Sequence, residues 1–98
     1  MCKREIVFKL LKKVPRDKVT TYAELARAAG THPRAVAVFM RDNRDPANVP
    51  CFRVVRSSGE VGGYSAAGGA MKKADLLERE GIRVTAGKVD LARHLHRF

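Results

Sequence analysis

Apolar residues over the first fourteen positions recur at the spacing of one helical face, and charged residues occupy the opposite face. The apolar positions are Ile6, Val7, Leu10, Leu11 and Val14. Because Pro15 cannot continue a helix, the pattern predicts a first helix over residues 2–14.

Two shorter helices are predicted next, joined by a tight turn. Thr21 is a good N-cap and Glu24 completes a capping box, so a helix is expected over residues 22–29. Gly30 ends it as a residue beyond the C-cap, and a second short helix follows over residues 34–41. The residues expected to face inward on this second helix are Val36, Met40 and either Ala37 or Phe39. Two short helices around a glycine turn indicate a helix-turn-helix, although ordinary helical hairpins have the same pattern.

The second half of the chain reads as short β structure and further helices. The pattern predicts a strand over residues 52–56, a glycine-rich hairpin over residues 57–65 and a helix over residues 70–79. A short apolar piece at residues 82–84 and a last helix or turn over residues 89–95 complete the chain. The predicted fold class is therefore mainly α with a small β hairpin.

Charge is the most biased feature of the composition. Twenty Lys and Arg residues oppose ten Asp and Glu residues, which leaves a net charge of +10. Such an excess favours a polyanion, with nucleic acid as the leading partner and an anionic membrane surface behind it. The plain alternative is a soluble protein that is merely basic. Because no apolar run approaches the ~20 residues of a membrane helix, and no secretory signal is visible, we expect a cytoplasmic protein without membrane contact.

The candidate nucleophile is Cys51, one of only two cysteines. We expect Cys51 and Cys2 to be free thiols, and no histidine has a metal-ligand spacing to either, so no metal site is expected. Cys51 lies between the predicted helix-turn-helix and a flexible glycine loop, which suggests chemistry on DNA. The alternative is a buried, inert cysteine in a strand.

Several motifs resemble the O6-alkylguanine-DNA alkyltransferases. Residues 50–55, Pro-Cys-Phe-Arg-Val-Val, are similar to the family's active-site pattern Pro-Cys-His-Arg-Val. Residues 57–59 and 61–65 resemble the glycine-rich stretch that follows and ends in Tyr-Ser. Residues 19–26 match the family's first DNA-binding helix, and residues 34–43 match its Arg-Ala-Val…Met-Arg-x-Asn segment.

The resemblance implies a winged helix-turn-helix-like DNA-binding and active-site domain over residues 1–98, without the family's N-terminal domain. Such a domain binds the minor groove of double-stranded DNA as a monomer and flips an O6-alkylguanine into a pocket. The cysteine then takes the alkyl group irreversibly, without a cofactor. The implied activity is that of a self-inactivating methylated-DNA–protein-cysteine methyltransferase.

The resemblance also implies residue roles. The catalytic residues would be Cys51, as alkyl acceptor, and the buried carboxylate Glu80, with Lys72 near the site. The DNA-binding residues would be Tyr22, Arg34, Arg41 and Asn43. Among these, Tyr22 would press the phosphate, Arg34 would fill the gap in the base stack, and Asn43 would brace the loop beside the cysteine. The base pocket would be lined by Val54, Gly62, Gly63, Tyr64 and Ser65. The ordinary alternatives are core packing for Tyr22 and Val54, a phosphate contact for Arg34 and a helix-end charge for Glu80.

One departure from the family pattern is Phe52, which stands where the family has the histidine that relays the thiol proton. Glu80 then lacks its usual partner and would pair with Arg53 or a lysine. The thiol would ionise unaided, or His32, Lys72 or Glu80 would substitute through water, or the domain would bind lesions without transfer. The last outcome describes a non-enzymatic alkyltransferase-like protein that signals to excision-repair proteins, and a plain helix-turn-helix regulator is the third alternative. Retention of Cys51 favours transfer.

Overall fold

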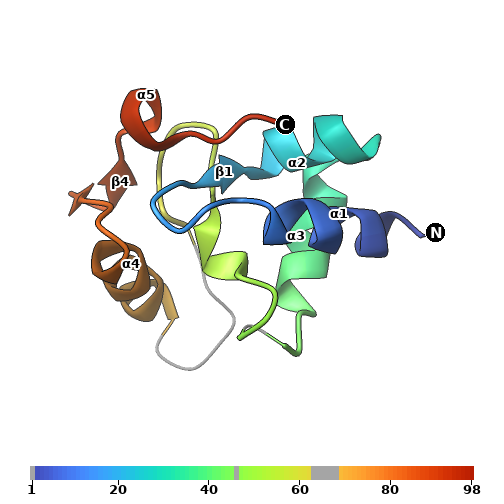
Figure 1. Cartoon of the computed structure of the whole chain (residues 1–98), viewed down its shortest axis with the longest axis horizontal. Coiled ribbons are helices and arrows are strands. Elements are labelled where there is room, and N and C mark those ends of the chain that lie inside the picture. Colours follow the sequence, from blue (N-terminus) through green and yellow to red (C-terminus); the bar gives the residue numbers. More distant parts are fainter. Residues whose placement is uncertain (1, 46, 63–68) are drawn as a thin grey trace.

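Short elements of helix and strand make up the computed structural model, which describes residues 2–45, 47–62 and 69–98 (Figure 1). The helices are α1 (Lys3–Lys12), α2 (Tyr22–Ala29), α3 (Pro33–Arg41), a 3-10 helix η1 (Cys51–Arg53), α4 (Gly69–Arg79) and α5 (Leu91–His94). The strands are β1 (Thr20–Thr21), β2 (Val54–Val55), β3 (Val84–Thr85) and β4 (Lys88–Val89). The predicted class, mainly α with a small β hairpin, is confirmed.

The helix-turn-helix forms where its local signals predict it. The Thr21 hydroxyl accepts the Glu24 N–H at 3.0 Å, which caps α2, and Gly30 ends α2 in the left-handed region at φ 72°. The Glu24 carboxylate instead accepts hydrogen bonds from Arg27 and from the backbone N–H of Phe98. The capping box is therefore formed only in its first half.

The two flanking helices differ from the prediction mainly at their ends. α1 ends at Lys12 rather than Val14, although Val14 is still buried. α3 begins at Pro33, where the missing proline N–H costs nothing. On α3, Val36 and Met40 are buried and Phe39 packs against the core, whereas Ala37 is exposed.

The strand predicted over residues 52–56 is wrong for its first half. Residues 51–53 form η1, in which the Arg53 N–H bonds to the Pro50 carbonyl at 3.0 Å, and only Val54–Val55 is strand. This strand pairs in parallel with β1, Thr20 with Val54. The pairing joins segments more than thirty residues apart, so a local pattern does not show it.

A turn forms within the predicted hairpin, where the Arg56 N–H bonds to the Glu60 carbonyl at 2.9 Å, but the antiparallel pair of strands lies elsewhere. The chain turns at residues 56–59, where the Gly59 N–H bonds to the Arg56 carbonyl at 2.8 Å. Gly59 has φ +91°, and a Cβ there would lie 2.7 Å from the Val89 carbonyl oxygen, so this position requires glycine. The antiparallel hairpin is β3–β4, where an apolar piece and the start of a helix were predicted. Residues 63–65 lie outside the described residues.

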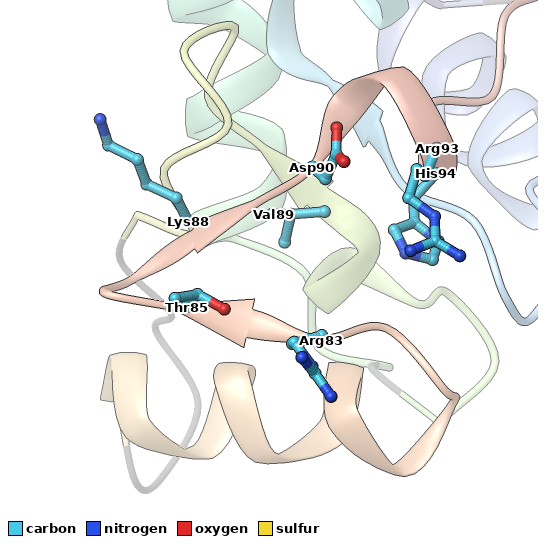
Figure 2. A pocket seen from close by; sticks show the side chains of 7 residues that line it. All are labelled: Arg83, Thr85, Lys88, Val89, Asp90, Arg93 and His94. Atoms are coloured by element: carbon cyan, nitrogen blue, oxygen red, sulfur yellow. The ribbon is translucent and has the colours of Figure 1, made fainter.

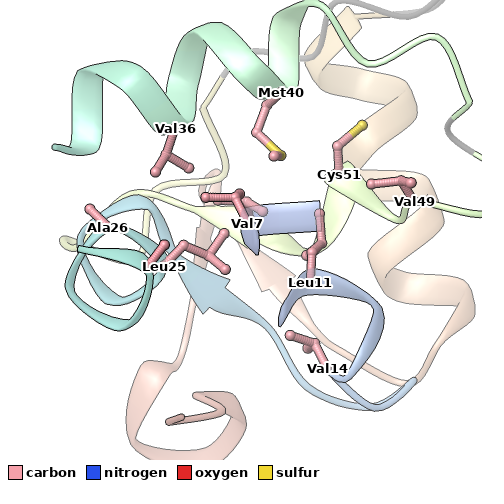
Figure 3. Close-up of a cluster of buried hydrophobic side chains, with 11 residues drawn as sticks. Val7, Leu11, Val14, Leu25, Ala26, Val36, Met40, Val49 and Cys51 are labelled. Carbon is pink, nitrogen blue, oxygen red and sulfur yellow. The ribbon is translucent and has the colours of Figure 1, made fainter. Parts of the chain in front are cut away.

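Two buried clusters hold these elements together, one on each side of the parallel strand pair. Figure 3 shows the first, in which α1, α2 and α3 enclose Val7, Leu11, Leu25, Val36 and Met40. The second lies between α4 and the hairpin, and it contains Val19, Val55, Val61, Leu77, Ile82 and Val89. The segment at residues 51–55 contributes to both clusters. In Figure 1, α1, α2 and α3 accordingly lie on one side of β1, and α4 lies on the other.

Among the described residues, no helix is long and apolar enough to cross a membrane.

Candidate active site and DNA interface

Cys51 opens η1 at the border of the first cluster. It is 6% exposed and free, and Figure 3 shows its sulfur pointing away from Leu11. Its own N–H bonds to the Val49 carbonyl at 2.8 Å, so the turn that carries the thiol is fixed. A buried thiol on a rigid turn is positioned for one approach direction.

Asn43 holds the loop that leads to this turn. Its Nδ2 donates to the Val49 carbonyl at 2.9 Å, and its Oδ1 accepts the Asp45 N–H at 2.9 Å. The Val49 N–H in turn donates to the Asp45 carbonyl at 2.8 Å. This is the bracing geometry that the resemblance implies for Asn43, whereas its contact with DNA remains a prediction.

The side chain that replaces the family histidine lies in the other cluster. Phe52 is half-buried and packs against the second cluster, with the Arg53 guanidinium 5.2 Å from its ring centre. Arg53 makes a two-pronged bond to Glu80, Nε to Oε1 at 2.9 Å and Nη2 to Oε2 at 2.5 Å. Arg53 Nη1 also donates to the Val14 carbonyl at 3.0 Å. Glu80 therefore pairs with Arg53, one of the partners that the sequence predicts.

The lysine beside Cys51 is Lys73, not Lys72 as predicted. Lys72 is exposed, whereas Lys73 is 1% exposed and its Nζ lies 5.8 Å from the centre of the Tyr22 ring. Burial lowers the pKa of Lys73 to about 8; nearby Cys51 counteracts this and Arg56 adds to it. Burial likewise raises the pKa of Tyr22, so its phenol is neutral at neutral pH.

Helical spacing could have identified Lys73 in the sequence. It lies four residues before Leu77, which is fully buried in the second cluster, so both project from one face of α4. The usual rule that lysines stay exposed argued against that placement. Buried lysines are rare, which makes the position informative about function.

The outer face of α3 is the candidate DNA-reading surface. Arg34, Ala37, Val38 and Arg41 are exposed at helical spacing, and Val38 is 39% exposed. Ala37 and Val38 lie between the two arginines. Their small side chains would allow α3 to approach a DNA groove closely, and the arginines would contact the phosphates at its edges.

Two predicted DNA-binding residues meet at one depression beside α3. Tyr22, Pro33, Arg34, Ala37 and Arg56 line this pocket of about 310 Å³. Because the same Tyr22 lies beside Lys73 and Cys51, it connects the surface of α3 with the thiol.

The predicted base pocket is only partly described. The Val54 side chain is completely buried in the first cluster, which is the core-packing alternative. Gly62 has φ +76°, and a Cβ there would lie 3.4 Å from Arg56 Nε. Gly63, Tyr64 and Ser65 lie outside the described residues, and their roles stay predictions. Within the described ranges, no cluster of three metal-ligating side chains occurs.

A second depression, of about 360 Å³, lies between the β3–β4 hairpin and α5 (Figure 2). Arg83, Lys88 and Arg93 line it together with one carboxylate, Asp90. In Figure 2, Lys88 extends away from Arg93 and His94. These cations do not converge on one point, so the depression is not a formed anion site.

The fold and site together define a helix-turn-helix DNA-binding domain that holds a buried cysteine behind its reading helix. Residues 3–82 match the family described as "6-O-methylguanine DNA methyltransferase, DNA binding domain". The chain belongs to this DNA-repair family.

A curated relative is the methylated-DNA–protein-cysteine methyltransferase of Methanothermobacter thermautotrophicus, 42% identical over 76 residues. That match covers 78% of this chain and 42% of the relative. Across the first curated relatives, the chain spans between 30% and 50% of their length.

Two solved structures are similar to this chain. Atl1 of S. pombe, in complex with damaged DNA containing O6-carboxymethylguanine, has a TM-score of 0.87 and 26% identity, covering 98% of this chain and 95% of that one. The O6-methylguanine-DNA methyltransferase of Pyrococcus kodakaraensis has a TM-score of 0.74 and 42% identity, covering 84% and 47%.

Proposed function

We propose that this domain repairs DNA by transferring the alkyl group of an O6-alkylguanine to Cys51, once per protein molecule. The observation that carries the proposal is a buried thiol on a fixed turn that acts electrostatically on Tyr22, which lines the depression beside Arg34, and on the amine of Lys73. The net charge of +10 supplies the attraction to a duplex.

In the proposed reaction, α3 enters the minor groove and the alkylated base rotates out of the stack. Flipping costs a few kcal/mol, least for a damaged base. Arg34 fills the gap while Tyr22 presses on the phosphate. The Cys51 sulfur then attacks the alkyl carbon, so that the S–C bond forms while the C–O6 bond breaks. The product cysteine is a thioether that does not turn over, so a modest rate is sufficient.

Mass spectrometry of the intact protein tests this function. In a Cys2→Ser background, incubation with a duplex that contains O6-methylguanine should add the mass of one methyl group, on the peptide that contains Cys51. The matched Cys51→Ala variant should stay unmodified. Unmodified protein that nevertheless binds the lesion tightly would contradict transfer.

Lesion binding without transfer is the second candidate function. It is favoured by Phe52, which has no proton acceptor, and by the overall likeness to Atl1. This candidate predicts equal lesion affinity for the parent protein and for Cys51→Ala, with no alkyl transfer at any time. Excision-repair proteins would then be the partners.

Replacing Arg34 with Ala should weaken binding to the alkylguanine duplex by about 10-fold or more, since one charge-assisted contact contributes roughly 1.5–3 kcal/mol. Arg16→Ala is the matched control, because Arg16 is exposed but lies outside the α3 depression. Fluorescence anisotropy at two salt concentrations measures both affinities. Equal losses for the two variants would show that Arg34 contributes only general charge.

A further inference from the structure

The position of Cys51 raises the question of where its proton goes. Phe52 offers no acceptor, and the Glu80 carboxylate is engaged by two nitrogens of Arg53. His32 is exposed at the N-cap of α3, in the depression that Arg34 also lines. These three side chains are therefore unsuited to receive the thiol proton.

Among the described residues, three other ionisable side chains belong to the electrostatic surroundings of Cys51, each on a different segment: the thiol acts on Tyr22 and Lys73, and Arg56 acts on both of these. Tyr22 on α2 is held neutral by its raised pKa, and Arg56 after β2 carries a permanent charge. Lys73 on α4 is the third, and α4 packs directly against η1. Of these, only an amine can exchange a proton with a thiol near neutral pH.

Burial makes Lys73 suitable for this exchange. Its side chain is enclosed beside the Tyr22 ring, and the lowered pKa of about 8 leaves a sizeable neutral fraction just above neutral pH. Free cysteines in general ionise in the same pH range as an amine with such a lowered pKa. Because Cys51 raises the pKa of Lys73, the thiolate and the ammonium stabilise each other.

We propose that Lys73 takes the proton of the Cys51 thiol in this domain and then holds the thiolate as its counter-ion. This inference rests on the proposed function of Cys51 as the alkyl acceptor. In this proposal a residue of α4 accepts the thiol proton, because Phe52, the residue after the cysteine, cannot accept it.

The step conserves protons and electrons. The S–H proton moves to the neutral Nζ, which leaves a thiolate and an ammonium. The thiolate electron pair forms the S–C bond, and the C–O6 electron pair stays on the departing guanine. Lys73 returns the proton to that guanine, so no oxidant, reductant or cofactor is consumed.

The test is the pH profile of thiol alkylation by iodoacetamide in the absence of DNA, in a Cys2→Ser background. In Lys73→Met the midpoint of the profile should rise by about 1–3 pH units, the usual effect of removing a neighbouring opposite charge. The rate at neutral pH should then fall about 10-fold or more. Lys72→Met, its exposed neighbour on α4, should leave the profile unchanged.

Lys73→Arg separates charge from proton exchange. An arginine keeps the counter-ion but does not accept a proton, so the neutral-pH rate of iodoacetamide reaction should stay closer to the parent than that of Lys73→Met. Superimposable profiles for the parent and a folded Lys73→Met would overturn the proposal. If Lys73→Met does not fold, NMR titration of Lys73 decides: its midpoint should fall in Cys51→Ala, and an unchanged midpoint would equally overturn it.

Because iodoacetamide reports on the thiol alone, the two proposals fail separately. A Lys73-dependent profile without transfer from alkylguanine DNA would remove the proposed function and leave the ionisation device. Transfer from DNA with a profile that does not depend on Lys73 would do the reverse.

Discussion

Replacing Glu80 with Gln is expected to lower the free energy of unfolding by about 2–4 kcal/mol, because removing one partner of a buried pair leaves the other charge uncompensated. The Arg53 and Glu80 side chains are only 16% and 10% exposed. Their bonds also tie η1 to the end of α4 and, through the Val14 carbonyl, to the end of α1. Urea denaturation followed by circular dichroism measures the loss.

The matched control is Glu78→Gln, because Glu78 is exposed near the end of α4, two residues before Glu80. Its effect should stay within about 0.5 kcal/mol. The double variant Arg53→Met, Glu80→Leu should recover much of the stability, since apolar replacement of a buried pair is often neutral. The pH profile of Cys51 alkylation should survive in Glu80→Gln, and a profile displaced as far as in Lys73→Met would place Glu80 in the proton path.

The helix-turn-helix was predictable because its signals are local. The cap at Thr21, the left-handed Gly30 and Pro33 at the first turn each act within a few residues, and they delimit α2 and α3 almost to the residue. The same local reasoning failed at residues 52–56. There a short β-branched run reads as strand, whereas the Pro50 carbonyl starts a 3-10 turn and the remainder pairs with a distant strand.

The residue motifs of the candidate site are visible in the sequence, whereas the electrostatic surroundings of these residues are not. The motif around Cys51 and the helix spacing of Arg34 are visible in the letters of the chain. Helical spacing relative to Leu77 places Lys73 on the buried face of α4, but its neighbours there, η1 and the Tyr22 ring, are a tertiary result that the spacing does not show. The choice of Arg53 as partner for Glu80 was one of several open alternatives, and only the fold decides among them.

Replacing Phe52 with His should destabilise the domain without restoring a fast reaction. The ring packs against the second cluster, so a polar imidazole there should cost about 1–3 kcal/mol of unfolding free energy. Glu80 stays bound to Arg53, so the new imidazole lacks an orienting carboxylate. The transfer rate should rise by less than about 10-fold, short of the roughly 100- to 10,000-fold that a positioned general base contributes.

The stability of the Phe52→His variant should decrease toward acid pH. The Arg53 guanidinium, 5.2 Å from the ring centre, opposes a second positive charge, so the folded-state pKa of the new histidine should lie below its ordinary value of about 6.5. The unfolded chain then binds the proton more readily, and the stability of this variant should fall further as the pH drops through that value. Denaturation at acid and alkaline pH, compared with the parent, measures this loss. A rate increase of about 100-fold or more would instead show that the missing imidazole limits the reaction, which would leave Lys73 no necessary part in it.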